Sequence, residues 1–221
     1  MVCICFFSPS SFTETELFAI AEREGVFECF GDGERERINK ISNPSGKALS
    51  LGGLIALGRA TSELGISKSP LHIFRDSFGK PRFEGEVGAF SISHASALAV
   101  AAVSVSGEIG IDIERIDPTR DTERIAERFF SEAERSEVSA AEDKVREFYR
   151  IWTAKEAMMK LGGEGMISIM SSDSSAAKRS GERSFARRDI SFDGADYILT
   201  LCTRSPEEIK VISCDGVVLL R

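Results

Sequence analysis

The segment 109–114 carries two carboxylates whose spacing suits a metal ion. Its sequence is Ile-Gly-Ile-Asp-Ile-Glu, and alternate side chains of a β-strand point to opposite faces. Asp112 and Glu114 therefore share one face, roughly 6.6 Å apart along the strand, and Gly110 leaves open space beside them. Two close carboxylates repel each other unless a cation lies between them, and oxygen ligands favour Mg²⁺ or Ca²⁺ over zinc. The alternative is a solvated strand face that happens to carry two acids.

The segment 148–161 is predicted to form a helix that carries an acid and two bases. Trp152, Glu156 and Lys160 recur at every fourth position, so they share one face of the helix, and Lys155 lies beside them. A surface Glu–Lys pair is the ordinary meaning of this spacing. The many aromatic, Met and Ile side chains around them indicate instead a largely covered helix, and buried charges need partners.

A third group of polar residues lies at and before the end of a predicted strand, 87–93. Ser93 and His94 end that strand, Lys80 lies in a basic turn between a glycine and a proline, and Arg37 lies earlier in the chain. A lone histidine is more often structural than catalytic. Together, however, the basic, imidazole and hydroxyl groups would form a pocket for an anion.

The elements that would position these residues alternate between helices and strands. The predicted strands are 2–7, 87–93, 97–105, 109–116, 189–192, 197–202, 209–213 and 217–220. The predicted helices are 13–24, 49–64, 119–129, 131–147 and 148–161. A turn at Ser106-Gly107 separates two stretches in which helices and strands both occur. The sequence therefore predicts an α+β fold of two similar halves, residues 1–106 and 107–221.

Composition limits the classes of function. The chain has 221 residues, 42% of them hydrophobic, and a net charge of −7. This negative charge argues against a nucleic-acid-binding protein, which would present a basic face. Its apolar runs are shorter than the about 18 residues of a membrane span, and its first residues lack the basic region of a signal peptide. We therefore expect a cytoplasmic protein that binds neither nucleic acid nor membrane, with reduced cysteines.

Taken together and in order, these motifs resemble those of the 4′-phosphopantetheinyl transferase superfamily. The resemblance is to the Sfp-type members, which activate nonribosomal peptide and polyketide synthases. The matching segments are Gly79-Lys80-Pro81, Ser91-Ile92-Ser93-His94, residues 109–114, Arg128-Phe129-Phe130 with Glu134, and residues 152–160. Each motif alone is weak, but their joint occurrence in this order is specific.

The resemblance implies a role for each residue that matches a motif. The implied metal ligands, for Mg²⁺, are Asp112, Glu114 and Glu156. The implied catalytic residues are Glu156, Lys160 and Lys155. The implied contacts to coenzyme A are Lys80, Ser93, His94, Arg37 and Lys160, the last on its phosphates. The first half would bind the 3′-phosphoadenosine end, the second half would hold the metal, and a pseudo-twofold axis would relate the halves.

The resemblance also implies the reaction and its partner. The 4′-phosphopantetheine arm of coenzyme A would pass to a serine of an apo acyl or peptidyl carrier protein, as in a holo-acyl-carrier-protein synthase, and 3′,5′-ADP would leave. Because the chain contains both halves, we expect it to work as a monomer. Two alternatives remain open: another Mg²⁺-dependent enzyme that hydrolyses a nucleotide, and a non-catalytic module that binds coenzyme A or the carrier.

Overall fold

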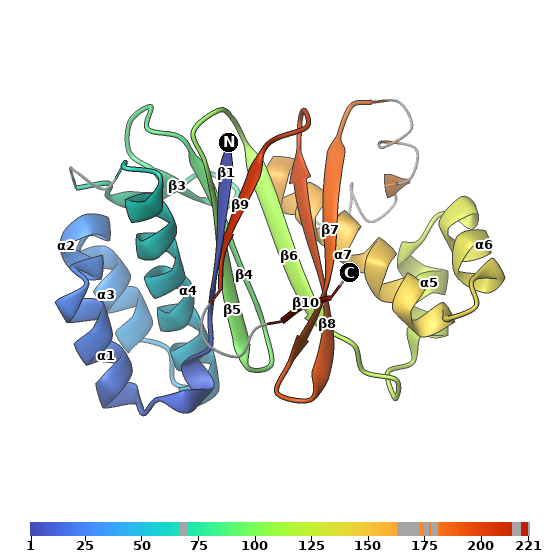
Figure 1. Cartoon of the computed structure of the whole chain (residues 1–221), viewed down its shortest axis with the longest axis horizontal. Coiled ribbons are helices and arrows are strands. Elements are labelled where there is room, and N and C mark those ends of the chain that lie inside the picture. The colour runs from blue at the N-terminus through green and yellow to red at the C-terminus, as the bar shows by residue number, and fades with distance from the viewer. Residues whose placement is uncertain (67–69, 163–172, 175–176, 178–180, 214–217, 221) are drawn as a thin grey trace. The chain divides into compact units, whose positions relative to one another are not determined.

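The computed structural model describes residues 1–66, 70–162, 173–174, 177, 181–213 and 218–220 (Figure 1). The chain divides into two compact units. One contains Met1–Glu108 and Glu207–Asp215, and the other contains Ile109–Pro206 and Gly216–Arg221. Each unit contains both helices and strands, which confirms the predicted α+β class. Among the described residues, we find no helix with the length and apolar character that crossing a membrane requires.

The first unit is built on a four-stranded sheet in the order β4-β5-β1-β9. β5 (Leu98–Ser104) is antiparallel to both β4 (Ala89–Ala95) and β1 (Val2–Phe7). β9 (Ile209–Ile212) joins β1 as a parallel strand on its other side. Every residue of β1 and β5 is buried, which explains why their sequences are almost continuously apolar.

The helices of the first unit lie on one side of this sheet (Figure 1). They are α1 (Glu14–Arg23), α2 (Val26–Phe30), α3 (Asp32–Asn39) and α4 (Pro44–Glu63). Glycine lets α4 approach the sheet closely, because a Cβ on Gly53 would lie 2.7 Å from the Cγ2 atom of Ile92 in β4. A short hairpin of β2 (Ile73–Arg75) and β3 (Pro81–Phe83) completes the unit.

The second unit is built on a four-stranded antiparallel sheet in the order β10-β7-β8-β6. Its strands are β6 (Ile109–Arg115), β7 (Ser184–Phe192), β8 (Ala195–Thr203) and β10 (Val218–Leu220). Its helices are α5 (Thr122–Phe129), α6 (Glu132–Ala140) and α7 (Lys144–Gly162). α7 packs against β6 and β8. It begins before residue 148, so the predicted division into helices 131–147 and 148–161 was wrong.

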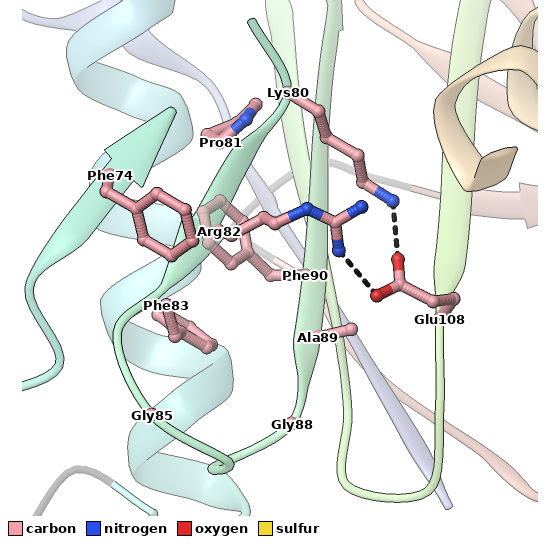
Figure 2. A pocket seen from close by; sticks show the side chains of 10 residues that line it. All are labelled: Phe74, Lys80, Pro81, Arg82, Phe83, Gly85, Gly88, Ala89, Phe90 and Glu108. Atoms are coloured by element: carbon pink, nitrogen blue, oxygen red, sulfur yellow. Dashed lines mark hydrogen bonds and ion pairs between the residues drawn. The ribbon is translucent and has the colours of Figure 1, made fainter. Parts of the chain in front are cut away.

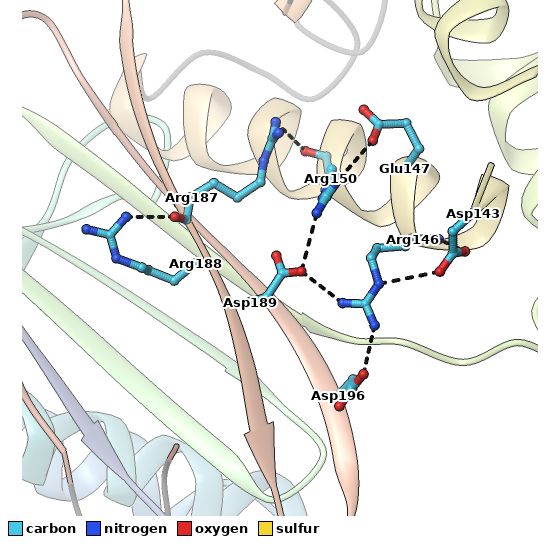
Figure 3. A network of polar contacts seen from close by, with 8 residues as sticks. All are labelled: Asp143, Arg146, Glu147, Arg150, Arg187, Arg188, Asp189 and Asp196. Atoms are coloured by element: carbon cyan, nitrogen blue, oxygen red, sulfur yellow. Dashed lines mark hydrogen bonds and ion pairs between the residues drawn. The ribbon is translucent and has the colours of Figure 1, made fainter. Parts of the chain in front are cut away.

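Charged side chains tie α7 to β7 and β8 (Figure 3). Arg146 donates to Asp189 at 2.9 Å and to Asp196 at 2.7 Å. Arg150 donates to the same Asp189 oxygen at 3.3 Å, and Arg187 of β7 donates to the main-chain oxygen of Arg150, also at 3.3 Å. These contacts fix the helix over the sheet and so help to set which of its faces meets β6.

Candidate active site

Gly110 sets how closely α7 approaches the strand that carries the acids. A Cβ at this position would lie 1.9 Å from the main-chain oxygen of Ala157 and 2.5 Å from the main-chain nitrogen of Leu161. Only glycine fits there without moving the helix. The structure thus corrects our expectation that Gly110 leaves open space beside the two acids, because the backbone of α7 fills that space.

The helix face predicted from the spacing of Trp152, Glu156 and Lys160 contacts β6. Lys160 Nζ donates a hydrogen bond to Asp112 Oδ1 at 2.8 Å. Trp152 Nε1 donates to Glu114 Oε1 at 3.3 Å. Glu156 lies one helical turn after Trp152 and one turn before Lys160. It is therefore on the same face of α7, between the two contacts. The structure therefore brings the three acids and Lys160 into one site.

Burial and nearby negative charge raise the pKa of the two glutamates of this site. The pKa of Glu156 rises to about 7, first because burial disfavours its charged form and then because Asp112 and Glu114 are negative, while the Lys160 ammonium opposes the shift. The pKa of Glu114 is also raised by burial and by Asp112, and the nearby Arg120 opposes it. The site thus has more negative charge than its cations balance.

Arg120 is a residue of this site that sequence reasoning missed. Its guanidinium lies 3.9 Å from Glu114 Oε2 and above the ring of Trp152, 5.5 Å from the ring centroid. Arg120 follows β6 in a connecting segment, where no helical or strand periodicity indicates the direction of a side chain. The sequence therefore contained no signal that would have placed it beside Glu114.

The donor set of this site fits a hard divalent cation. Within the described part of the chain, no three His, Cys, Asp or Glu side chains already surround a metal position. Lys160 and Trp152 instead contact Asp112 and Glu114. All three acids offer oxygen, however, and together they outnumber the two nearby cations, Lys160 and Arg120. Oxygen ligands with uncompensated charge are what Mg²⁺ binds in proteins.

Lys155 has an acidic partner that we did not predict, Glu134 at the start of α6. Its ammonium is fully buried and donates to Glu134 Oε2 at 2.9 Å. The main-chain nitrogen of Ser131 donates to that same oxygen at 2.9 Å, while the hydroxyl and main-chain nitrogen of Ser174 donate to Glu134 Oε1 at 2.6 and 2.9 Å. Lys155 and Glu134 therefore form a buried ion pair that joins α7 to the start of α6.

A pocket of about 270 Å³ in the first unit contains Lys80 (Figure 2). Lys80 Nζ lies 2.7 Å from Glu108 Oε2, and Arg82 Nη1 lies 2.6 Å from Glu108 Oε1. Sequence reasoning missed Arg82 and Glu108. The alternation of a strand contained a signal for Arg82, because residues two positions apart in an extended segment point to the same side.

Three other residues predicted to bind coenzyme A lie elsewhere in the first unit. Ser93 is buried and His94 is exposed, and both belong to β4. Arg37 lies on α3, where its Nε atom donates to Glu34 Oε2 at 2.7 Å. Glu34 is itself buried and also accepts from Arg75 at 3.1 Å. None of the three predicted residues belongs to the lining of the Lys80 pocket.

Comparison with known proteins gives a family match over most of the second unit. The model of the 4′-phosphopantetheinyl transferase superfamily matches residues 108–202. This range includes β6, α7 and the acids that meet between them.

Individual relatives extend the match. The chain is 30% identical over 178 residues to a 4′-phosphopantetheinyl transferase of Bacillus subtilis, and the match covers 76% of each protein. It is 36% identical over 112 residues to the 4′-phosphopantetheinyl transferase HetI of Nostoc sp., covering 48% of this chain and 47% of HetI. With the 4′-phosphopantetheinyl transferase psf-1 of Bacillus pumilus it shares 33% identity, over 58% of this chain and 59% of that relative. The chain thus spans about half the length of HetI.

Proposed function

The chain belongs to the 4′-phosphopantetheinyl transferase superfamily, and from this membership we propose that it transfers 4′-phosphopantetheine from coenzyme A to a serine of an apo carrier protein. One observation carries the proposal. The acids of β6 and the acid and base of α7 meet in one site, where Glu156 lies between the contacts to Asp112 and Glu114. With a divalent cation bound, such a site would neutralise a diphosphate, and its carboxylates could accept a proton from a hydroxyl group.

The three carboxylates, from Asp112, Glu114 and Glu156, would hold Mg²⁺. When bound, Mg²⁺ supplies positive charge to the coenzyme A diphosphate. The ammonium of Lys160, which donates to Asp112 in this structure, would supply a second positive charge to a phosphate oxygen. Positioning and charge neutralisation are the main requirements of phosphoryl transfer.

Glu156 is our candidate for the base. The serine oxygen of the carrier forms a bond to the β-phosphorus of coenzyme A, and the bond from that phosphorus to 3′,5′-ADP breaks. The proton of the serine hydroxyl passes to a Glu156 carboxylate oxygen, directly or through a water molecule. The pKa of this carboxylate is raised to about 7 in the free protein, and a bound cation would lower it, which favours the route through a water molecule.

The first unit would bind the 3′-phosphoadenosine end of coenzyme A. Lys80 has a charged partner that a phosphate can replace, and the polar side chains of Ser93, His94 and Arg37 would contribute further contacts. Because one chain contains both the basic pocket and the acids, it would act as a monomer. The Sfp-type relationship indicates carrier domains of peptide or polyketide synthases as partners, or an acyl carrier protein.

Intact mass measurement tests the proposal. An apo carrier protein incubated with the enzyme, coenzyme A and Mg²⁺ should gain about 340 Da, the mass of the phosphopantetheine group. Asp112→Asn and Glu156→Gln should each reduce the rate at least a hundredfold, because each removes a carboxylate from the site. Release of free phosphate without a gain in carrier mass would indicate a hydrolase. Bound coenzyme A with neither product would indicate a binding module, and either result would overturn the proposal.

A further inference from the structure

The basic pocket of the first unit contains its own acid. Glu108 accepts from Lys80 at 2.7 Å and from Arg82 at 2.6 Å, one contact on each carboxylate oxygen (Figure 2). Aromatic side chains of Phe74, Phe83 and Phe90 line the same pocket. Two cations therefore converge on one carboxylate beside apolar rings, which is an arrangement that suits an anion attached to a planar base.

Asp76, in the turn between β2 and β3, helps to hold Lys80 and Arg82 in place. Asp76 Oδ2 accepts from Arg82 Nε at 2.7 Å, and Asp76 Oδ1 accepts from the main-chain nitrogen of Lys80 at 3.0 Å. Arg82 thus keeps an ionic partner if it loses Glu108. The side chain of Lys80 is only 9% exposed, so its ammonium is confined to the pocket. Two fixed cations form an anion site whether or not Glu108 occupies it.

Glu108 gives the two cations a partner of the same kind as a phosphate. A carboxylate and a phosphate present similar pairs of oxygen atoms to Lys and Arg, and both favour charge-assisted hydrogen bonds. Burial alone would raise the pKa of Glu108, but the hydrogen bonds and charges of Lys80 and Arg82 lower it below its usual value. The acid is therefore ionised at neutral pH. About a third of its side chain is exposed, at 32%, so it has a route towards solvent.

We propose that Glu108 is an internal competitor for the 3′-phosphate of coenzyme A, and that it weakens binding of this substrate by holding Lys80 and Arg82. The inference rests on the proposed function and names one determinant of its substrate affinity. A dianionic phosphate monoester has more charge than the glutamate and displaces it, whereas a ligand without that phosphate leaves the Glu108 contacts intact. Glu108 thereby reduces the preference for coenzyme A over dephospho-coenzyme A. Without it, the two cations would give a larger difference in affinity between these ligands.

Calorimetric titration of the whole protein with coenzyme A, dephospho-coenzyme A and 3′,5′-ADP tests this inference. Glu108→Gln keeps the shape of the side chain and removes its charge. We expect it to bind coenzyme A and 3′,5′-ADP roughly five- to tenfold more tightly than the wild type, because two cations lose their competitor. The affinity for dephospho-coenzyme A should change less than twofold between Glu108→Gln and the wild type. Equal gains for all three ligands, or no gain for coenzyme A, would overturn the proposal.

Two further variants separate competition from other effects of the charge change. Glu86→Gln removes an equally negative but exposed side chain near the pocket and should leave all three affinities unchanged. In a protein that already carries Lys80→Met, the gain in affinity that Glu108→Gln produces should be smaller, since only the competition for Arg82 remains. Glu108→Ser repeats the test with a smaller side chain if Glu108→Gln folds poorly. A loss of affinity in both Glu108 variants would show that this acid positions the cations and does not compete.

The same titrations distinguish this inference from the proposed function. A wild-type protein that leaves the carrier unmodified would refute the transferase assignment but not the competition at Lys80. In that case Glu108→Gln should still bind 3′,5′-ADP more tightly than the wild type. A transferase whose Glu108→Gln variant binds 3′,5′-ADP with wild-type affinity would refute only the competition.

Discussion

Glu156 is a half-buried carboxylate whose ionisation depends on its neighbours. Burial and the negative charges of Asp112 and Glu114 raise its pKa to about 7. Without a cation, this side chain is therefore partly protonated in the folded protein at neutral pH. A bound divalent cation reverses this balance, because it favours the ionised form of the carboxylates around it. The same residue thus links the acid cluster to the pH dependence of folding.

At the residue scale we predict that, in EDTA, the contribution of Glu156 to the stability of the folded protein falls as the pH rises from 4.5 to about 7. The folded-state pKa of Glu156 lies above its ordinary value, so the folded chain binds more protons in this window and loses stability as they dissociate. Glu156→Gln should reduce this fall and be more stable than the wild type at pH 8 by about 1–2 kcal/mol, after allowing for solvent screening. Urea unfolding of both proteins at pH 5 and pH 8 measures these differences in stability. Identical pH dependence in both proteins would contradict the prediction.

At the scale of elements, the contact between α7 and β6 determines whether the acids meet. Gly110 permits this contact, because any larger residue would place a Cβ against the backbone of the helix at Ala157. Arg146 and Arg150 fix the other side of α7 to the sheet. A displaced helix would therefore carry Glu156 away from the strand acids.

Gly110→Ala should consequently lower both stability and activity. The added methyl group has no room, and overpacking of this kind typically costs about 1–3 kcal/mol. We expect transfer to the carrier to slow more than tenfold, because small displacements of reacting groups have large effects on rate. Gly107→Ala is the matched control, since a Cβ at Gly107 meets nothing within 4 Å. Urea unfolding and carrier mass measure the two effects, and equal behaviour of the two variants would refute the role of Gly110.

Local signals in the sequence predicted several elements correctly. Ser131 and Glu134 have the Ser-x-x-Glu spacing of a capping box, and both reciprocal hydrogen bonds are present. The apolar runs at 2–7 and 97–105 correspond to the central strands β1 and β5. The helical face of Trp152, Glu156 and Lys160 meets the strand acids. Each of these elements is determined by residues that are close in sequence, so the local sequence pattern is enough to predict it.

Signals that depend on distant contacts were missed. α3 is polar along most of its length and buries Glu34 and Ile38, so it lacks the apolar period of a helix. The start of α7 was misplaced, because Ala141 ends α6 in an extended conformation that no proline or glycine marks. The partner of Lys155 lies in another helix, and spacing within a helix does not reveal it.

At the scale of the whole molecule, the two units do not follow the chain in simple order. β9 comes near the end of the chain but pairs with β1, its first strand, whereas we had predicted residues 107–221 as one half. A short strand with alternating side chains does not specify which edge it will join. The sequence therefore indicated how many strands to expect in this region but not the sheet to which each belongs.

The division into units predicts where each ligand protects the chain. Mg²⁺ should slow amide hydrogen exchange in peptides that cover β6 and α7, because it would bind the acids there and suppress local opening. 3′,5′-ADP should instead slow exchange in peptides that cover the β2–β3 hairpin, which carries Lys80 and Arg82. Exchange measured by mass spectrometry on the whole protein separates the two effects.

Asp112→Asn provides the control for this experiment. It removes one carboxylate from the metal site without changing side-chain size, so protection by Mg²⁺ should disappear while protection by 3′,5′-ADP remains. The Lys160 contact to Asp112 explains why the effect should extend along α7, since a cation that replaces Lys160 changes the contacts of the helix as well as those of the strand. Protection by Mg²⁺ that persists in Asp112→Asn, or that falls on the hairpin, would mean that the cation binds outside the acids of β6 and α7.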